Sequence, residues 1–272
     1  MTDSPTTSSA PQAEGDAEID TTVPQSPRIW NYWMGGTDNY EVDRRIGDAY
    51  RAAAPSIEVM ARASRVYLIR TVTFLARECG VRQFLEIGPG LPTYDSTHEV
   101  LRREAPGARV VYVDKDPLVL RRVRAAREAD PETVAGCVAA DLHEPDAILE
   151  AVRGPLDFDQ PVALVLAGIL GHIQDFDESL SIVRRLLAPL PSGSYFLHYE
   201  GTDTEQSLGD GQAIYEGTGA EPYVMRTPGQ LARYYDGLDL VEPGIVSCPL
   251  WRPEPGESPE VVDIYGGVAR KP

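Results

Sequence analysis

Short apolar runs alternate with helical patterns along most of the chain, and this alternation limits the fold more than any other feature. Strand-like runs occupy residues 83–87, 109–113, 136–140, 162–167 and 193–199. Apolar residues at helical spacing occupy residues 59–79, 97–104, 117–129 and 178–187. The run 162–167 is apolar almost throughout, which is typical of a strand buried on both faces. The repeated strand–helix order predicts an α/β fold with an open, mostly parallel sheet and helices on both faces.

The last third of the chain departs from this order. Residues 230–235 have a helical pattern, and two strand-like segments follow at 240–248 and 261–269, with only a proline-rich loop between them. Neighbouring strands that are joined without a crossover helix are typically antiparallel. We therefore expect an antiparallel hairpin at one edge of the sheet.

Composition divides the chain into three parts. The first 25 residues are rich in Ser, Thr, Pro, Asp and Glu and contain almost nothing apolar. Such a segment buries too little apolar surface to offset the entropy lost on ordering, which predicts a disordered tail over residues 1–25. We expect a helical cover segment at 26–80 and the main α/β domain at 81–272.

The net charge limits the partners. The 42 acidic and 25 basic side chains leave a formal charge of −17, which repels nucleic-acid backbones and anionic membranes and favours solubility. Three widely spaced cysteines predict neither a disulfide framework nor a metal site. No signal-peptide pattern or run of about 18 apolar residues occurs. We expect a cytoplasmic protein without metal, nucleic acid or membrane partners, and leave a homodimer open.

Segments that directly follow the predicted strands carry the candidate binding chemistry, because ligands of open α/β sheets bind at the carboxyl ends of the strands. These segments are residues 86–90, Asp114, Asp141 with Leu142, and residues 167–173. Gly88 and Gly90 lack a Cβ and let the backbone approach a ligand closely. Asp114 follows Gly90 by 24 residues, a spacing at which an acidic side chain can accept hydrogen bonds from ribose hydroxyls.

The glycine loop differs from a dinucleotide-binding loop at one position. The pattern G-x-G-x-x-G would place a third glycine where this chain has Thr93. That glycine allows close helix packing where a helix N-terminus faces the pyrophosphate. S-adenosylmethionine has no phosphate, and the acidic Glu86 suits its sulfonium and amino groups. The loop therefore favours S-adenosylmethionine over NAD.

Matches to a known family extend from about residue 27 to the end of the chain. They comprise Tyr32, residues 35–40, Asp43, and residues 83–93, 97–100, 110–117, 141–142, 161–166, 241–244, 251–253 and 265–268. Through these segments the chain resembles the actinobacterial S-adenosyl methyltransferases formerly grouped as a domain of unknown function. The resemblance implies a Rossmann-like class I methyltransferase domain over 81–272, with a seven-stranded sheet and an antiparallel last strand. It also implies S-adenosylmethionine as donor, but no particular substrate.

The candidate site residues combine these motifs with the residues considered individually. The candidate cofactor-binding residues are Tyr32, Gly35, Asn39, Arg65, Glu86, Gly88, Pro89, Gly90, Asp114, Lys115, Asp141, Leu142, Ala167 and Gly168. The candidate substrate-binding residues are Trp33, Tyr40 and Tyr199. Arg65 is included because it could reach the carboxylate of the donor. The chain departs from the family pattern at Ser96, usually Asn, and at Gly171, where we expect a histidine and find His172 one place later.

Residues 30–40 combine four aromatic side chains with Gly35 and Gly36. This composition favours a hinged cover that closes over the site. The alternative is that Trp30, Tyr32 and Trp33 only anchor the N-terminal segment in the core, but an anchor has no need of the adjacent glycines.

His172 is the candidate catalytic residue. It follows the fourth strand, and a histidine that titrates near neutrality can accept a proton from an O–H or N–H nucleophile. A hydrogen-bonded structural histidine is the alternative. His98 lies in the first turn of a helix, where the positive helix end favours a neutral, structural imidazole.

These features together predict an S-adenosylmethionine-dependent methyltransferase that acts on a small, aromatic secondary metabolite by in-line transfer. Alignment of the nucleophile can lower the barrier by up to about 7–11 kcal/mol. Tyr94, Tyr199, Tyr223 and the aromatic cover suggest a flat acceptor that stacks on rings. Two other functions stay open: a non-catalytic S-adenosylmethionine-binding regulator and an NAD-linked oxidoreductase.

Overall fold

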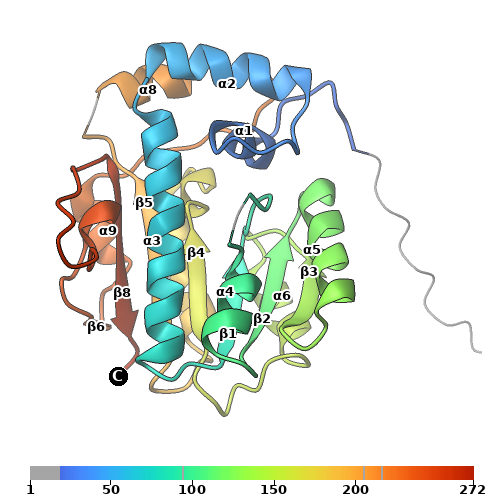
Figure 1. Ribbon diagram of the computed structural model, residues 1–272, viewed down its shortest axis with the longest axis vertical. Coiled ribbons are helices and arrows are strands. Elements are labelled where there is room, and N and C mark those ends of the chain that lie inside the picture. Colours follow the sequence, from blue (N-terminus) through green and yellow to red (C-terminus); the bar gives the residue numbers. More distant parts are fainter. Residues whose placement is uncertain (1–18, 94, 205, 216) are drawn as a thin grey trace, which may run out of the picture.

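The computed structural model describes residues 19–93, 95–204, 206–215 and 217–272, which form a three-layer α/β fold (Figure 1). The strands are β1 (Gln83–Ile87), β2 (Arg109–Asp114), β3 (Val134–Ala139), β4 (Ala163–Ala167), β5 (Tyr195–Gly201), β6 (Asp239–Leu240), β7 (Val246–Ser247) and β8 (Ile264–Arg270). The helices are α1 (Ser26–Trp33), α2 (Glu41–Ala53), α3 (Ile57–Arg77), α4 (Thr97–Glu104), α5 (Pro117–Ala129), α6 (Pro145–Val152), α7 (Phe176–Leu187), α8 (Gln206–Ala213) and α9 (Pro228–Arg233), with 3-10 turns η1 (Leu170–His172) and η2 (Cys248–Leu250). Of the predicted tail, residues 1–18 lie outside the described range.

The sheet confirms the predicted α/β class. Its strand order is β3-β2-β1-β4-β5-β8-β6, and β7 also pairs with β8. Strands β1 to β5 are parallel, and β8 is antiparallel to its neighbours. The chain moves outward from β1 to β3 on one side and from β4 to β5 on the other. The carboxyl ends of β1 and β4 therefore flank the point at which a ligand binds in such sheets.

The C-terminal end of the sheet differs in detail from the prediction. The strand expected at 240–248 is split into β6 and β7, so the sheet has eight strands among the described residues. Pro243 has no N–H to donate to a ladder, and Gly244 has a φ of +88°, which turns the chain. The N–H of Gly244 donates to the carbonyl of Val241. Strand β8 therefore lies inside the sheet, and β6 and β7 form the edge.

Each face of the sheet has its own hydrophobic core. Phe84 of β1 packs in the core beneath α3, α4 and α5, whereas Leu85 packs in the core beneath α6 and α7. All five residues of β1 are buried, as expected for a central strand covered on both faces. The longest helix, α3, ends at Arg77, and Gly80 follows with a positive φ, the conformation that often follows a helix end. No helix in the described parts of the chain is long and apolar enough to cross a membrane.

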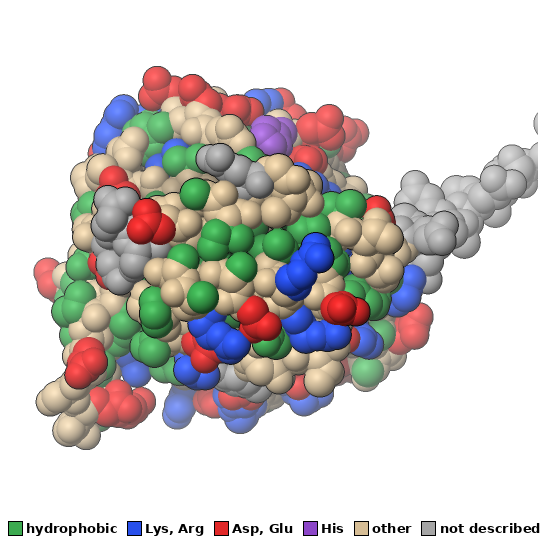
Figure 2. Space-filling view, turned by 90° about the horizontal axis from the view of Figure 1, so that it is seen from above, with side chains coloured by type: hydrophobic (Ala, Val, Ile, Leu, Met, Phe, Trp, Pro, Cys, Tyr) green, Lys and Arg blue, Asp and Glu red, His purple; other side chains and the backbone are tan. Residues whose placement is uncertain are grey.

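Helices α1, α2 and α8 form a cap across the carboxyl ends of the parallel strands (Figure 1). The ring of Trp33 packs against that of Tyr50 at 4.9 Å, and Tyr50 packs against Tyr215 at 5.7 Å. The indole N–H of Trp33 donates to the carbonyl of Gly47 (3.0 Å). Figure 2 shows the cap from outside, where hydrophobic side chains gather across the middle with charged ones around them. The cap thus joins segments that are far apart in the sequence, residues 26–53 and 206–215.

Candidate cofactor and acceptor site

A cavity of about 390 Å³ lies between the cap and the carboxyl ends of β1, β2 and β4. Most of the predicted site residues line it. They are Trp33, Arg65, Glu86, Gly88, Pro89, Gly90, Asp114, Lys115, Asp141, Leu142, Ala167, Gly168, His172 and Tyr199. The carboxyl ends of parallel strands meet at one edge of the sheet, which explains why residues far apart in sequence come together here.

The loop after β1 has the backbone conformation that requires glycine. Gly88 and Gly90 have φ values of +70° and +67°. The N–H of Gly88 donates to the carbonyl of Val113, which fixes the loop to β2 (2.8 Å). A Cβ on Gly88 would lie 2.7 Å from Ile169, whereas a Cβ on Gly90 would meet nothing within 4 Å. Gly90 thus leaves room for a ligand to approach the backbone.

Glu86 brings a buried carboxyl group to the cavity. Its side chain is 2% exposed, and within the described chain its Oε2 has no hydrogen-bond partner. Burial raises the pKa of Glu86, and the hydroxyl of Thr97 and the charge of Arg65 oppose that shift. A buried carboxyl oxygen without a donor is costly, and the amino group of S-adenosylmethionine would supply one. The residues present therefore fit this cofactor.

Asp114 ends β2 and also lines the cavity. One carboxyl oxygen accepts the backbone N–H of Asp116 (2.9 Å). Burial raises the pKa of Asp114 to about 7, and the N–H of Asp116 opposes the shift. Ribose hydroxyls that donate to this carboxylate would favour its charged form. Asp114 is therefore suited to bind a ribose.

Lys115 connects the cofactor side of the cavity to the opposite wall. Its Nζ lies 3.2 Å from a carboxylate oxygen of Asp141 and 2.6 Å from one of Glu221. Partial burial opposes ionisation of Asp141, but hydrogen bonds from the backbone and ring of His143 and from Lys115 lower its pKa to about 2. Asp141 is thus a charged acceptor at neutral pH, in contrast to Asp114.

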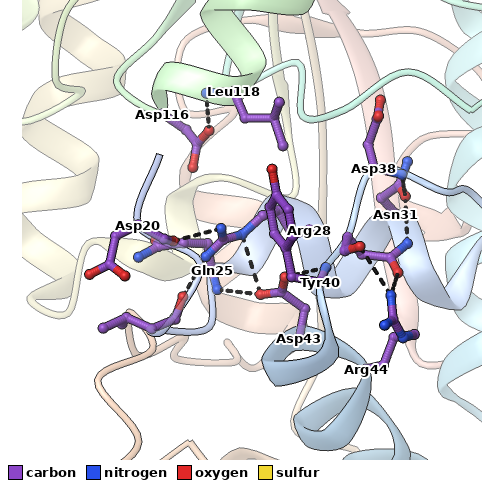
Figure 3. A network of polar contacts seen from close by, with 12 residues as sticks. Asp20, Gln25, Arg28, Asn31, Asp38, Tyr40, Asp43, Arg44, Asp116 and Leu118 are labelled. Carbon is purple, nitrogen blue, oxygen red and sulfur yellow. Dashed lines mark hydrogen bonds and ion pairs between the residues drawn. The ribbon is translucent and has the colours of Figure 1, made fainter. Parts of the chain in front are cut away.

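Arg28 of α1 forms a buried ion pair within the cap and also binds the chain before α1. Arg28 is 1% exposed, and its Nε lies 3.3 Å from a carboxylate oxygen of Asp43. Its other nitrogens donate to the carbonyls of Asp20 (2.8 Å) and Val23, and its guanidinium stacks on the ring of Tyr40 (Figure 3). Residues 19–25, placed in the tail by composition, therefore pack on the folded body and contribute Ile19, Asp20 and Gln25 to the cavity lining.

Four predicted site residues in the cap do not line the cavity. They are Tyr32, Gly35, Asn39 and Tyr40. The hydroxyl of Tyr32 donates to Asp48 of α2 (2.8 Å), and Tyr40 packs on Arg28. Gly35 has a φ of +79°, which the turn after α1 requires. Binding by these side chains stays a prediction, while their observed contacts hold the cap together.

Asn31 links this turn to the glycine loop. Its side-chain oxygen accepts the amide N–H of Asn39 (3.0 Å), and its side-chain nitrogen donates to the carbonyl of Pro92 (3.4 Å). A Cβ on Gly36 would lie 2.3 Å from Asn31, so Gly36 makes room for this contact. The paired glycines of the predicted hinge thus have a steric role as well, and movement of the cover stays a prediction.

His172 lies at the end of η1 and faces the cavity. Its Nδ1 lies 3.1 Å from the carbonyl oxygen of Pro222, and its Nε2 lies 3.3 Å from the hydroxyl of Ser26. A carbonyl only accepts hydrogen bonds, so Nδ1 carries the proton of the neutral ring and Nε2 accepts from Ser26. The lone pair of Nε2 is therefore directed at the lining of the cavity. His98 has a structural setting, since its Nδ1 bonds to the hydroxyl of Tyr112 and burial lowers its pKa.

Sequence reasoning missed a group of lining residues from the cap, the first turn of α3 and the C-terminal loops. These include Tyr50, Ile57, Met60, Leu208, Tyr215 and Met225. They belong to segments that are distant in sequence and carry no local motif, so only their packing brings them together. Of the tyrosines expected near the acceptor, Tyr199 and Tyr223 line the cavity and Tyr94 lies outside the described residues.

Comparison with known proteins agrees with this site. The sequence profile of the S-adenosyl methyltransferase family matches residues 12–272. A DUF574 family protein of Streptomyces avermitilis is 41% identical, with a TM-score of 0.88 over 94% of this chain and 100% of that one. A methyltransferase candidate from Thermobifida fusca is 35% identical, with a TM-score of 0.86 over 93% and 96% of the two chains. No curated protein matches the chain.

A distant structure shares the fold alone. The N-methyltransferase NodS of Bradyrhizobium japonicum, solved with S-adenosyl-L-homocysteine, is 14% identical, with a TM-score of 0.51 over 78% of this chain and 88% of that one. The family match, together with the glycine loop, Glu86 and Asp114, favours a methyl donor over NAD and catalysis over binding alone. The chain therefore belongs to the S-adenosyl methyltransferase family and is a class I methyltransferase that uses S-adenosylmethionine.

Proposed function

We propose that this enzyme methylates a small aromatic secondary metabolite, and that His172 takes the proton of its hydroxyl or amino group. The observation that carries the proposal is the orientation of His172. Its Nε2 faces a cavity lined by aromatic rings and lies within hydrogen-bond distance of the hydroxyl of Ser26. The hydroxyl of Ser26 occupies the position relative to Nε2 that an acceptor O–H would need.

The lining supports an aromatic acceptor. The rings of Trp30, Trp33, Tyr50, Tyr215 and Tyr223 contribute to it. Aromatic rings pack favourably against one another, and stacked or edge-to-face pairs add about 0.5–1.5 kcal/mol beyond the burial of their area. A flat, mostly apolar metabolite would therefore bind between the cap and η1, beside the donor site.

The protein would act mainly by positioning. The bound cofactor would supply an electrophilic methyl group on a sulfonium, from which a neutral thioether is a good leaving group. Glu86 and Asp114 would hold the amino and ribose ends of the donor, and the cap would exclude water from the acceptor. Neutral His172 would accept the acceptor proton at Nε2, while the carbonyl of Pro222 stabilises the proton at Nδ1.

An extract assay tests the proposal. The purified protein is incubated with S-adenosylmethionine and a metabolite extract, and mass spectrometry follows release of S-adenosylhomocysteine and the gain of one methyl group in an acceptor. We expect His172→Gln to lower turnover by about 100-fold or more, the usual range for a lost general base. Calorimetric binding of S-adenosylhomocysteine should be unchanged in this variant. Full turnover by His172→Gln would contradict the role of His172, and a non-aromatic product would contradict the acceptor class.

A further inference from the structure

Glu200, at the end of β5, is a fully buried carboxyl group that donor binding does not explain. It is not exposed at all and does not line the cavity. Its Oε1 accepts the backbone N–H of Leu170 (2.7 Å), and its Oε2 accepts the hydroxyl of Tyr223. A buried carboxyl group is costly to keep unless its hydrogen bonds serve the fold or the function. The imidazole Nε2 of His198 also lies 3.7 Å from Oε1. The two hydrogen-bond partners, Leu170 and Tyr223, lie on the acceptor side of the cavity.

Tyr223 connects Glu200 to His172. Its hydroxyl also accepts the N–H of Gly201 (3.3 Å), so the phenol is held from two sides. Burial, followed by the charge of Glu200, raises the pKa of Tyr223 well above its usual value, which keeps the hydroxyl protonated as a donor. The ring lines the cavity and contacts the imidazole of His172 edge-to-face, with centroids 5.2 Å apart.

Gly171 provides the space for this ring. A Cβ at position 171 would lie 2.4 Å from the ring of Tyr223, a distance that real Cβ atoms do not tolerate. Gly171 is not among the glycines with positive φ, so its backbone does not require glycine. The carbonyl of Gly171 also accepts the N–H of Val224 (2.7 Å). The absence of a side chain at Gly171 therefore makes room for the ring of Tyr223, and no unusual backbone turn requires glycine there.

We propose that Tyr223 is a positioning residue for His172: anchored by Glu200 and admitted by Gly171, it fixes the adjacent Pro222 carbonyl that orients the imidazole. The proposal rests on the proposed role of His172. The Pro222 carbonyl is one residue from the anchored ring and accepts the Nδ1 proton at 3.1 Å. Displacement of Tyr223 removes the ring contact and moves this acceptor. The carboxylate of Glu221 lies 3.9 Å from Nδ1, too far to replace the hydrogen bond, so the preference of the neutral imidazole for an unprotonated Nε2 should fall.

Nitrogen NMR of the full-length protein bound to S-adenosylhomocysteine tests the orientation directly. The signals of His172 in ¹⁵N-histidine-labelled protein are assigned from the loss of signal in His172→Gln. In the wild type we expect the Nδ1–H tautomer to be about tenfold more populated than the Nε2–H tautomer, because one hydrogen bond of good geometry can shift an equilibrium by about that factor. In Gly171→Ala the added Cβ displaces Tyr223 without removing any polar group, and the preference should fall to about twofold or less.

A matched variant and a second perturbation complete the test. Gly154 also lacks a positive φ, and a Cβ there meets nothing within 4 Å, so Gly154→Ala should leave the tautomer of His172 unchanged. Tyr223→Phe keeps the ring but removes the bond to Glu200, and should also weaken the preference.

Two results would overturn the proposal. One is a His172 tautomer that is the same in wild type, Gly171→Ala and Tyr223→Phe. The other is a wild-type His172 that carries its neutral-state proton on Nε2. Neither depends on turnover, so the positioning role can fail while His172→Gln still abolishes methyl transfer. Conversely, full turnover by His172→Gln would disprove the role of His172 as a general base, but it would not change the measured tautomer of His172 in the wild type.

Discussion

Asp114 offers the most direct quantitative test of the donor site. Its carboxyl group is partly buried, lines the cavity and has a pKa of about 7, against an ordinary value of 3.8. An acid whose pKa is higher in the folded state destabilises the fold progressively as pH rises between these two values. Asp114→Asn removes the titration and keeps a side-chain oxygen for the N–H of Asp116. The variant should therefore be more stable than the wild type.

The size of the effect follows from the pKa shift. At about 1.4 kcal/mol per pKa unit, the wild type loses about 4 kcal/mol of unfolding free energy at pH 8 relative to a neutral side chain, and about 2 kcal/mol at pH 5. The stability advantage of Asp114→Asn should thus grow by about 2–3 kcal/mol from pH 5 to pH 8. The same variant should bind S-adenosylhomocysteine about 30-fold or more weakly, because hydrogen bonds from ribose to a charged acceptor are lost.

Urea unfolding at both pH values, without ligand, measures the stability difference, and calorimetry measures the affinity. Asp159→Asn is the control, since Asp159 lies in an exposed loop after α6 and should change neither quantity. A stability difference that does not depend on pH would refute the raised pKa of Asp114. Unchanged affinity would refute its contact with the donor.

Three further predictions concern the cavity and the cap. Calorimetry between pH 6 and 8 should show that affinity for S-adenosylhomocysteine rises with pH through about 7 in the wild type but not in Asp114→Asn, because the ribose requires the ionised carboxylate. Gly90→Ala and Gly107→Ala should each lower the free energy of urea unfolding by about 1–2 kcal/mol, because both glycines have a positive φ and space for a Cβ. Only Gly90 lines the cavity, so only Gly90→Ala should lose donor binding. Arg28→Met should destabilise the protein by about 3–5 kcal/mol in the same assay, because it leaves Asp43 buried without its partner. Equal donor binding by both alanine variants, or a loss below about 1 kcal/mol for Arg28→Met, would contradict these assignments.

Local patterns predicted the central elements well, because their causes are local. Strand β1 and helices α4 and α5 have the expected bounds, and the carboxylate of Glu99 accepts the N–H of Ser96 (2.7 Å) at the start of α4. The prediction failed at 240–248, where Pro243 and Gly244 interrupt the ladder. The apolar residues on both sides had suggested one continuous strand, although the adjacent Pro243 and Gly244 are a strong turn signal.

The sequence by itself brought together the residues proposed to bind the donor. Glycines and carboxylates that follow parallel strands must meet at one edge of the sheet, so Glu86, Gly88, Gly90 and Asp114 could be placed together without coordinates. Only the tertiary structure decided the acceptor half. Gly171, Glu200 and Tyr223 belong to separate segments, and their roles depend on contacts that Tyr223 makes with residues 23 and 52 positions before it. Side-chain packing is specific to three-dimensional neighbours, and no spacing in the sequence records that Gly171 leaves room for Tyr223.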